Sequence, residues 1–312
     1  MSEKKFVKEG IIVPLSTPFN KDESIDFPSL EKITKHIVDT GVHGIFLFGA
    51  CGEFPMLDEN EKRDILRTVK KVAGKKVPVL SCIGSMSTKK ADDEISRYVS
   101  LGADVVVLVP QSYYSNHDIN VLHRNYILPL TRELGVPFMI YDHQKPERVK
   151  LTPEIVKELS QNENFVGIKT KYVPKFIEQI RDYCPVFVGK DEAFLDSLKL
   201  GAKGGVCGSA NVIPQKFVNV FNDYKAGSLN AAEQGMDEIK RALEVIYGNP
   251  IADYLKGGAQ VGVKACLSVV GFCKPYCRRP FPQSSKRTIK IQNNRKLLIL
   301  NNTLYFLQFI EK

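Results

Sequence analysis

The sequence predicts an α/β fold, a (β/α)8 TIM barrel followed by additional C-terminal helices. Short apolar runs of strand length alternate with helix-patterned stretches, and eight such units occur in succession. A chain of 312 residues with 43% hydrophobic content has the size and the core of a single barrel. A doubly wound open sheet is the alternative, but no Gly-x-Gly-x-x-Gly motif follows the first run to support it.

The expected strands are short, continuous apolar runs, as in a parallel sheet that is covered on both faces. In chain order they are Ile11 to Leu15, Ile45 to Phe48, Val79 to Ile83, Val105 to Val109, Phe138 to Tyr141, Val166 to Lys169, Val186 to Gly189 and Gly205 to Cys207. The stretches between and after them have helical patterning, which predicts helices over Ser29 to Thr40, Glu59 to Val72, Lys89 to Leu101, Ile119 to Leu134, Pro153 to Ser160, Pro174 to Tyr183, Glu192 to Leu200 and Pro214 to Lys225.

Beyond the eighth unit the chain is expected to add helices and no strands. Helical patterns cover Asn230 to Tyr247 and Asp253 to Val270, and after Gly271 the patterning deteriorates. We therefore divide the chain into a catalytic barrel (1–227), a C-terminal helical extension (228–275) and a basic tail (276–312). A docked helix, a flexible arm and a sequence artefact all remain open for the tail.

The net charge of +9 raises the question of a nucleic-acid partner. Residues 274–312 contain nine basic residues and one acidic residue, so the rest of the chain carries only about +1. A protein that binds nucleic acid through its basic tail is the alternative from a different functional class. The nearly neutral charge of the rest of the chain argues against this alternative. We expect no nucleic-acid partner.

Compartment and redox state follow from what the sequence lacks. There is no apolar stretch of membrane-spanning length, and the N-terminus lacks the apolar core of a signal peptide, so we expect a cytoplasmic protein without a membrane partner. The seven cysteines are odd in number and show no CxxC spacing. They are interpreted as reduced thiols, with neither a metal site nor a disulfide framework.

Lys169 ends the apolar run Asn164 to Thr170, and two interpretations compete for it. It is either the first solvated residue after a strand or a partly desolvated amine at the C-terminal mouth of a barrel, able to attack a ketone. Tyr113 and Tyr141 fall at mouth positions of the same barrel. The loop Gly49-Ala50-Cys51-Gly52-Glu53 also follows a strand, and its backbone amides would suit a carboxylate.

From about Gly10 to Pro275 the chain resembles the pyruvate-utilising class I aldolases related to dihydrodipicolinate synthase and N-acetylneuraminate lyase. The motifs that carry the resemblance are Pro14-Leu15-Ser16-Thr17-Pro18-Phe19, Gly49-x-x-Gly52-Glu53-Phe54 with Leu57, Tyr141, and Gly167-Ile168-Lys169. The resemblance implies that Lys169 forms a Schiff base with the keto carbon of pyruvate, without a metal or other cofactor. It also implies that Tyr141 relays protons and that the Gly-x-x-Gly-Glu loop holds the pyruvate carboxylate.

The same resemblance assigns further substrate-binding positions. Ala50 and Cys51 stand where relatives usually have threonine or serine, so only their backbone amides remain as certain donors. Tyr113 matches a second catalytic tyrosine that reaches a neighbouring subunit in relatives. The remaining expected substrate-binding residues are Thr17 in the first loop, Val206 beside the pyruvate pocket, and a polar shelf for substrate hydroxyls formed by Asp191, Glu192 and Ser209.

The residue at position 146 bears on which substrate the chain would accept. Dihydrodipicolinate synthases have an arginine five residues after the catalytic tyrosine, where this chain has Pro146, and Arg148 comes two positions late. The resemblance therefore favours an aldolase that cleaves a 2-keto-3-deoxy sugar acid, such as 2-keto-3-deoxygluconate, to pyruvate and glyceraldehyde. The alternatives are 4-hydroxy-tetrahydrodipicolinate synthase, N-acetylneuraminate lyase and a non-catalytic ligand-binding barrel. A homotetramer built as a dimer of dimers is expected by the same resemblance.

Overall fold

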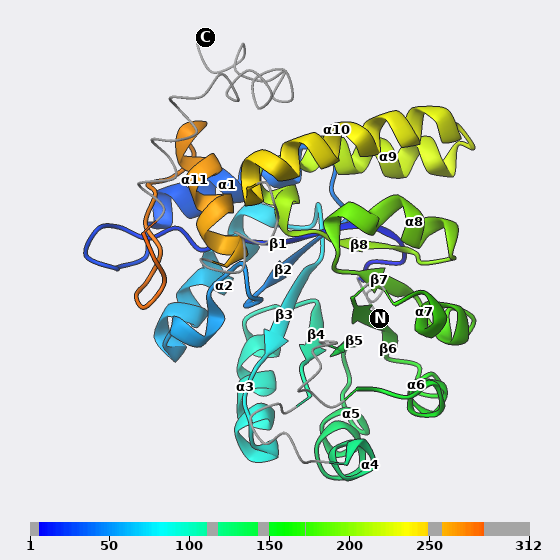
Figure 1. The fold of residues 1–312 in the computed structure, drawn as a ribbon. Helices are drawn as coiled ribbons and strands as arrows, with labels where there is room; N and C mark the ends of the chain where they lie inside the picture. Colours follow the sequence, from blue (N-terminus) through cyan, green and yellow to red (C-terminus); the bar gives the residue numbers. More distant parts are fainter. Residues whose placement is uncertain (1–5, 111–117, 143–149, 172, 249–257, 284–312) are drawn as a thin grey trace.

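A computed structural model describes residues 6–110, 118–142, 150–171, 173–248 and 258–283. Its eight parallel strands pair in sequence order, and β8 pairs with β1 to close a barrel (Figure 1). The predicted (β/α)8 fold is therefore confirmed. The strands are β1 (Gly10–Pro14), β2 (Gly44–Leu47), β3 (Val79–Ile83), β4 (Val105–Leu108), β5 (Phe138–Asp142), β6 (Phe165–Thr170), β7 (Val186–Val188) and β8 (Gly204–Val206).

The barrel closes at a point where two backbones nearly touch. A Cβ atom on Gly204 would lie only 1.9 Å from the carbonyl oxygen of Gly10, so β8 can approach β1 only with glycine at this position. The strand residues elsewhere are nearly all buried and mostly apolar, as expected for strands that are covered on both faces.

Helices surround the barrel in the order that the sequence predicts. They are α1 (Phe27–Asp39), α2 (Glu59–Ala73), α3 (Thr88–Ser100), α4 (Ile119–Leu122), α5 (Leu128–Thr131), α6 (Pro153–Leu159), α7 (Pro174–Ile180), α8 (Phe194–Lys199) and α9 (Pro214–Lys225). Short 3-10 turns follow three strands at the barrel mouth, namely η1 (Phe54–Met56), η3 (Asp191–Ala193) and η4 (Gly208–Asn211).

Two predicted helices differ in detail. The helix expected over Ile119 to Leu134 is interrupted by a π-helical segment, η2 (His123–Ile127), and ends at Thr131. Pro129 follows this segment and lacks a backbone N–H, which removes one donor from the regular α-helical ladder. The helix expected from Glu192 begins as the 3-10 turn η3 and becomes α-helical only at Phe194.

The C-terminal extension packs on one side of the barrel. Helix α10 (Leu229–Tyr247) lies beside α9, and α11 (Ala259–Val269) packs against α10 and η4 (Figure 1). Their buried residues, among them Met236, Ile239 and Leu267, belong to the same hydrophobic core as the strands. The part of the predicted helix Asp253 to Val270 before residue 258 lies outside the described residues, as does the tail from residue 284.

The described beginning of the basic tail, residues 276–283, is docked on the body in non-helical conformation. Arg278 pairs with Glu61 at 2.6 Å, and Arg279 pairs with Glu23. These acidic partners offset positive charge that the sequence suggested could attract a nucleic acid.

Candidate active site

Lys169 lies at the C-terminal end of β6, and its side chain enters the barrel. The residue is only 6% exposed. It is the register partner of Tyr141 on β5, so the two side chains leave the sheet on the same face. The Lys169 Nζ lies 3.9 Å from the centroid of the Tyr141 ring and 4.5 Å from that of Phe46 on β2. The two residues that the sequence singled out therefore meet inside the barrel.

Burial sets the charge state of this amine. Loss of water around the ammonium group lowers the pKa of Lys169 to about 8, against an ordinary value of 10.5. Three buried thiols, Cys51, Cys82 and Cys207, lie near the amine without supplying a negative charge. Burial raises the pKa of Cys51 and Cys82 to about 12, and it also raises the pKa of Cys207 well above its ordinary value. A substantial neutral fraction of the amine is thus available near neutral pH, as a nucleophile requires.

The rate of imine formation with pyruvate should report this pKa. Only the neutral amine attacks a ketone, and it becomes neutral as the pH rises through the pKa of about 8. The apparent second-order rate constant should therefore rise about tenfold per pH unit up to that pH and then level off. Stopped-flow or quenched borohydride trapping across the pH range measures it. A profile that keeps rising toward the ordinary lysine pKa of 10.5 would contradict the desolvated site.

The loop of residues 49–53, called here the carboxylate loop, turns tightly after β2. The amides of Gly52 and Glu53 are used inside the turn, donating to the carbonyl oxygens of Gly49 and Ala50 at 3.1 Å each. Within the described part of the chain, the amides of Ala50 and Cys51 have no acceptor. Thr17 Oγ1 donates to the Gly52 carbonyl at 2.8 Å. The hydroxyl predicted to bind substrate therefore braces the loop, while two adjacent amides remain available for an anion.

Neighbouring strand ends leave room around the amine. A Cβ atom on Gly189 would lie 3.3 Å from Lys169 Cε, so the absence of a side chain after β7 gives the lysine stem its space. A Cβ atom on Gly208 would lie 3.2 Å from Cys51 Sγ and 2.9 Å from the hydroxyl oxygen of Tyr247. Val206 is buried at the end of β8. Cys51 and Gly208, the first residue of η4, thus lie in close contact at the mouth.

The expected polar shelf is largely engaged with itself. The Asp191 carboxylate accepts from the amides of Gly208 and Ser209 at 3.0 and 2.8 Å, from Ser209 Oγ at 2.5 Å and from the Tyr247 hydroxyl at 3.0 Å. Burial raises the pKa of Asp191, while these hydrogen bonds favour its charged form. Glu192 is half-buried and lies 3.6 Å from Lys190. Among the three shelf residues, Glu192 retains a solvent-facing carboxylate.

Tyr113 lies outside the described residues, as do His143, Gln144, Pro146 and Arg148 in the segment after Tyr141. Phe46, in contrast, was not anticipated as a site residue. The available signal was strand alternation on β2, which places Phe46 on the opposite face from its neighbours Ile45 and Leu47.

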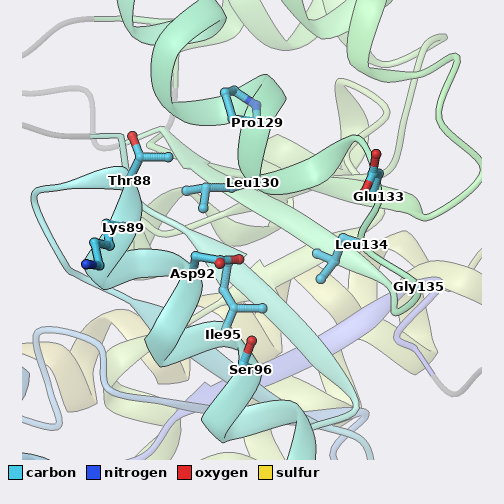
Figure 2. A pocket seen from close by; sticks show the side chains of 10 residues that line it. All are labelled: Thr88, Lys89, Asp92, Ile95, Ser96, Pro129, Leu130, Glu133, Leu134 and Gly135. Carbon is cyan, nitrogen blue, oxygen red and sulfur yellow. The ribbon is translucent and has the colours of Figure 1, made fainter.

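A cavity of about 490 Å³ opens beside the carboxylate loop. It is lined by Gly49, Ala50 and Tyr141 and extends toward Gln260 on α11 and Phe281. A second cavity of about 510 Å³ lies between α3 and the segment Pro129–Gly135, on the helical outside of the barrel, and contains none of the predicted site residues (Figure 2). Of these two cavities between described residues, the first adjoins the site.

The arrangement supports one kind of chemistry. A desolvated lysine beside a tyrosine provides a nucleophile for a ketone and a phenol that can carry a proton. Two unused amides can hold a carboxylate nearby. A keto acid is the ligand class that all three features accommodate.

Comparison with known proteins agrees with this chemistry. The model of the dihydrodipicolinate synthetase family matches residues 7–296. A 4-hydroxy-tetrahydrodipicolinate synthase of Thermodesulfovibrio yellowstonii is 30% identical over 89% of this chain and 94% of its own. A probable 2-dehydro-3-deoxy-D-pentonate aldolase of Escherichia coli is 29% identical over 87% of this chain and 91% of its own. The solved sialic acid aldolase of Ruminococcus gnavus shares the fold, with a TM-score of 0.83 at 19% identity over 96% of this chain and 99% of that one. No helix in the described ranges is long and apolar enough to cross a membrane.

Proposed function

Because the chain belongs to the dihydrodipicolinate synthetase family, we propose that it cleaves a 2-keto-3-deoxy sugar acid, such as 2-keto-3-deoxygluconate, to pyruvate and glyceraldehyde. Members of this family are pyruvate-dependent carbon–carbon lyases. They form a Schiff base on a lysine and use no external cofactor. The finer assignment, to a sugar acid, is the proposal.

In the proposed reaction Lys169 attacks C2 of the keto acid, and loss of water gives a protonated imine. Tyr141 accepts the proton of the C4 hydroxyl, the C3–C4 bond breaks, and its electron pair moves into the iminium to leave an enamine. Protonation of the enamine at C3 and hydrolysis of the imine release pyruvate and restore the amine. The amides of Ala50 and Cys51 would hold the carboxylate throughout, which keeps C2 near Lys169 Nζ.

The observation that carries the substrate assignment is Pro146. Sequence identity does not decide between a dihydrodipicolinate-type and a sugar-acid-type substrate, because representatives of the two match at 30% and 29%. The arginine that would hold a second carboxylate is replaced by proline at position 146, and proline has no charge to offer. The half-buried carboxylate of Glu192 at the mouth is suited to hydroxyl groups instead.

A panel of aldehydes condensed with pyruvate tests the assignment. Glyceraldehyde should react faster than aspartate semialdehyde and N-acetylmannosamine. A preference for aspartate semialdehyde would instead identify a 4-hydroxy-tetrahydrodipicolinate synthase, and one for N-acetylmannosamine an N-acetylneuraminate lyase. If borohydride traps no pyruvate on Lys169, the chain is a ligand-binding barrel without this chemistry.

The role of Tyr113 and the oligomeric state of the protein are predicted together. In related barrels the equivalent tyrosine reaches a neighbouring subunit, so we expect a homotetramer of paired dimers in which Tyr113 completes the partner's site. The near-neutral body opposes association only weakly. Analytical ultracentrifugation of the full chain and of Tyr113→Phe, each assayed for pyruvate release, measures both properties. A fully active monomer would contradict the tetramer and the shared site together.

A further inference from the structure

The carboxylate loop ends in a residue with unusual backbone geometry. Glu53 has φ 55° and ψ 36°, the left-handed region that non-glycine residues seldom occupy. The conformation turns the chain into η1 and directs the glutamate side chain inward, where the residue is only 1% exposed. Such a conformation persists when surrounding contacts determine it.

Those contacts come from the far end of the chain. The Glu53 carboxylate forms a buried ion pair and hydrogen bond with Lys264 on α11, and both side chains are completely inaccessible. Its second oxygen accepts from the main-chain N–H of Arg278 at 3.0 Å. The turn that presents the Ala50 and Cys51 amides is therefore fixed at its end by residues of the C-terminal extension and the tail.

Lys264 is an unusual residue for its helix. Between Ala259 and Cys273 it is the only charged residue, and residues 260–267 around it are buried. Its Nζ lies 4.1 Å from the centroid of the Phe19 ring, which also favours a cation. A buried ion pair is weak evidence for stability, because desolvation of both charges opposes their attraction, but it can specify a single conformation.

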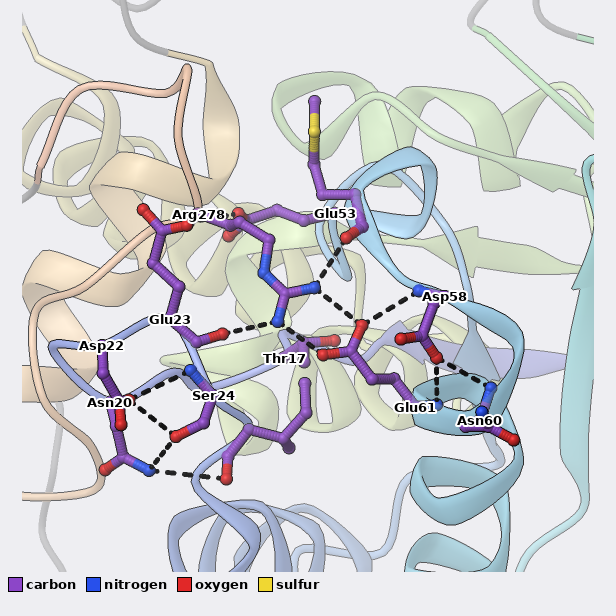
Figure 3. Close-up of polar contacts among 12 residues, drawn as sticks. Thr17, Asn20, Asp22, Glu23, Ser24, Glu53, Asp58, Asn60, Glu61 and Arg278 are labelled. Carbon is purple, nitrogen blue, oxygen red and sulfur yellow. Dashed lines mark hydrogen bonds and ion pairs between the residues drawn. The ribbon is translucent and has the colours of Figure 1, made fainter.

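The tail adds a second anchor to the same region (Figure 3). The Arg278 guanidinium donates to both carboxylate oxygens of Glu61, at 2.6 and 2.7 Å, and to the carbonyl of Met56 at the end of η1. Glu61 also closes the capping box of α2 with Asp58. The η1 turn is thus held between the ion pair at Glu53 and the arginine at Met56.

We infer that Lys264 is a positioning residue for pyruvate, acting through Glu53 on the amides of the carboxylate loop. The inference rests on the proposed function, because it assumes that these amides hold the carboxylate of a keto acid. Hydrogen bonds link the two ends of the turn, since the Glu53 amide donates to the Ala50 carbonyl at 3.1 Å. A shift of Glu53 would therefore move the amides of Ala50 and Cys51 away from the ligand.

Pyruvate trapping on the full chain tests the role. In Lys264→Met, the pyruvate concentration that half-saturates borohydride trapping on Lys169 should rise roughly tenfold, as expected for a misplaced binding group. The turnover rate at saturation should fall by less than about threefold, since the reacting amine and phenol are untouched. The double variant Glu53→Gln with Lys264→Met, which leaves no unpaired buried charge, should show the same rise. It replaces the single variant if that one does not fold.

Lys70→Met is the matched control. Lys70 forms a partly buried ion pair with Asp104 at 2.7 Å, and Asp104 also accepts from the amide of Val79 at the start of β3, the end opposite the mouth. The Lys70→Met substitution should lower the melting temperature of the protein. It should leave unchanged the pyruvate concentration that half-saturates trapping. Suppose that Lys264→Met or the double variant folds and needs the same pyruvate concentration for half-saturation as Lys70→Met. Lys264 would then have only a structural role, and the inference would be overturned. If neither Lys264 variant folds while Lys70→Met does, the pair serves folding, which also overturns it.

The proposed function can fail separately. Absence of a trapped adduct in the wild-type chain would remove the pyruvate site itself. If the wild-type chain forms the adduct and the Lys264 variants show an unchanged half-saturating pyruvate concentration, only the proposed role of Lys264 is contradicted.

Discussion

Replacing Lys169 with arginine is expected to abolish turnover and borohydride trapping of pyruvate. Arginine keeps a positive charge but stays protonated at any accessible pH, so it cannot form the imine. The site around Lys169 Nζ, bounded by the rings of Tyr141 and Phe46, offers the desolvated amine as its nucleophile. Pyruvate release from a sugar acid and mass spectrometry of the reduced adduct measure the two effects.

Lys169→Met serves as the companion variant, because it fills similar volume without a charge. It should be equally inactive and should melt at a higher temperature near neutral pH. The pKa of Lys169 falls from 10.5 to about 8 on folding, so the unfolded chain binds this proton more tightly. The resulting penalty is full below about pH 8, declines between pH 8 and 10.5, and vanishes above that range. Substantial activity in either variant would refute the assignment of the nucleophile.

Tyr141→Phe is expected to slow turnover by about 100-fold or more, the usual scale for loss of a positioned proton carrier. The variant keeps the ring that lies 3.9 Å from Lys169 Nζ and packs edge-on against Phe46, so the shape of the site is preserved. Steady-state cleavage of the sugar acid measures the loss. Trapping of pyruvate at equilibrium should persist, because the amine remains.

A second tyrosine provides the control. The Tyr224 hydroxyl donates to the Leu198 carbonyl at 2.9 Å, between α9 and α8 and away from the strand ends. Tyr224→Phe removes one hydroxyl and one hydrogen bond but should leave the rate unchanged. An unaltered rate in Tyr141→Phe would mean that another group carries the proton.

The sequence predicts the barrel well because each strand can be recognised from its own short stretch of residues. Each strand is a short apolar run, and runs such as Val105–Leu108 have the same bounds within a residue in the structure. The meeting of Lys169 and Tyr141 was also predictable, since both end strands whose carboxyl ends must share one mouth. These features depend on pattern and topology alone.

The hydrogen bonds that Asp191 and Ser209 of the polar shelf form within the protein could not be predicted from the sequence pattern. Asp191 and Ser209 were expected to bind substrate, and the structure shows the Asp191 carboxylate accepting hydrogen bonds from the hydroxyls of Ser209 and Tyr247. Tyr247 lies 56 residues further along the chain, and no spacing rule pairs it with Asp191. Hydrogen-bond partners of a buried carboxylate are decided by tertiary packing, which a single sequence does not encode in a readable pattern.

Lys264 left a signal that could have been used. A single charge within the mostly apolar segment 259–273 requires a buried partner or access to water. The partner, Glu53, lies inside a motif already singled out, 211 residues earlier. Only the closed barrel brings the two together.

That separation has a consequence for how the protein is made. Synthesis proceeds from the N-terminus, and a barrel of this kind can begin to fold while its C-terminal helices are still being translated. Lys264 and the Arg278 amide must leave the ribosome before Glu53 acquires its contacts. A nascent chain that already contains Lys169 and Tyr141 should therefore bind keto acids poorly until α11 and Arg278 emerge. Competence for pyruvate would then mark synthesis that has passed residue 278.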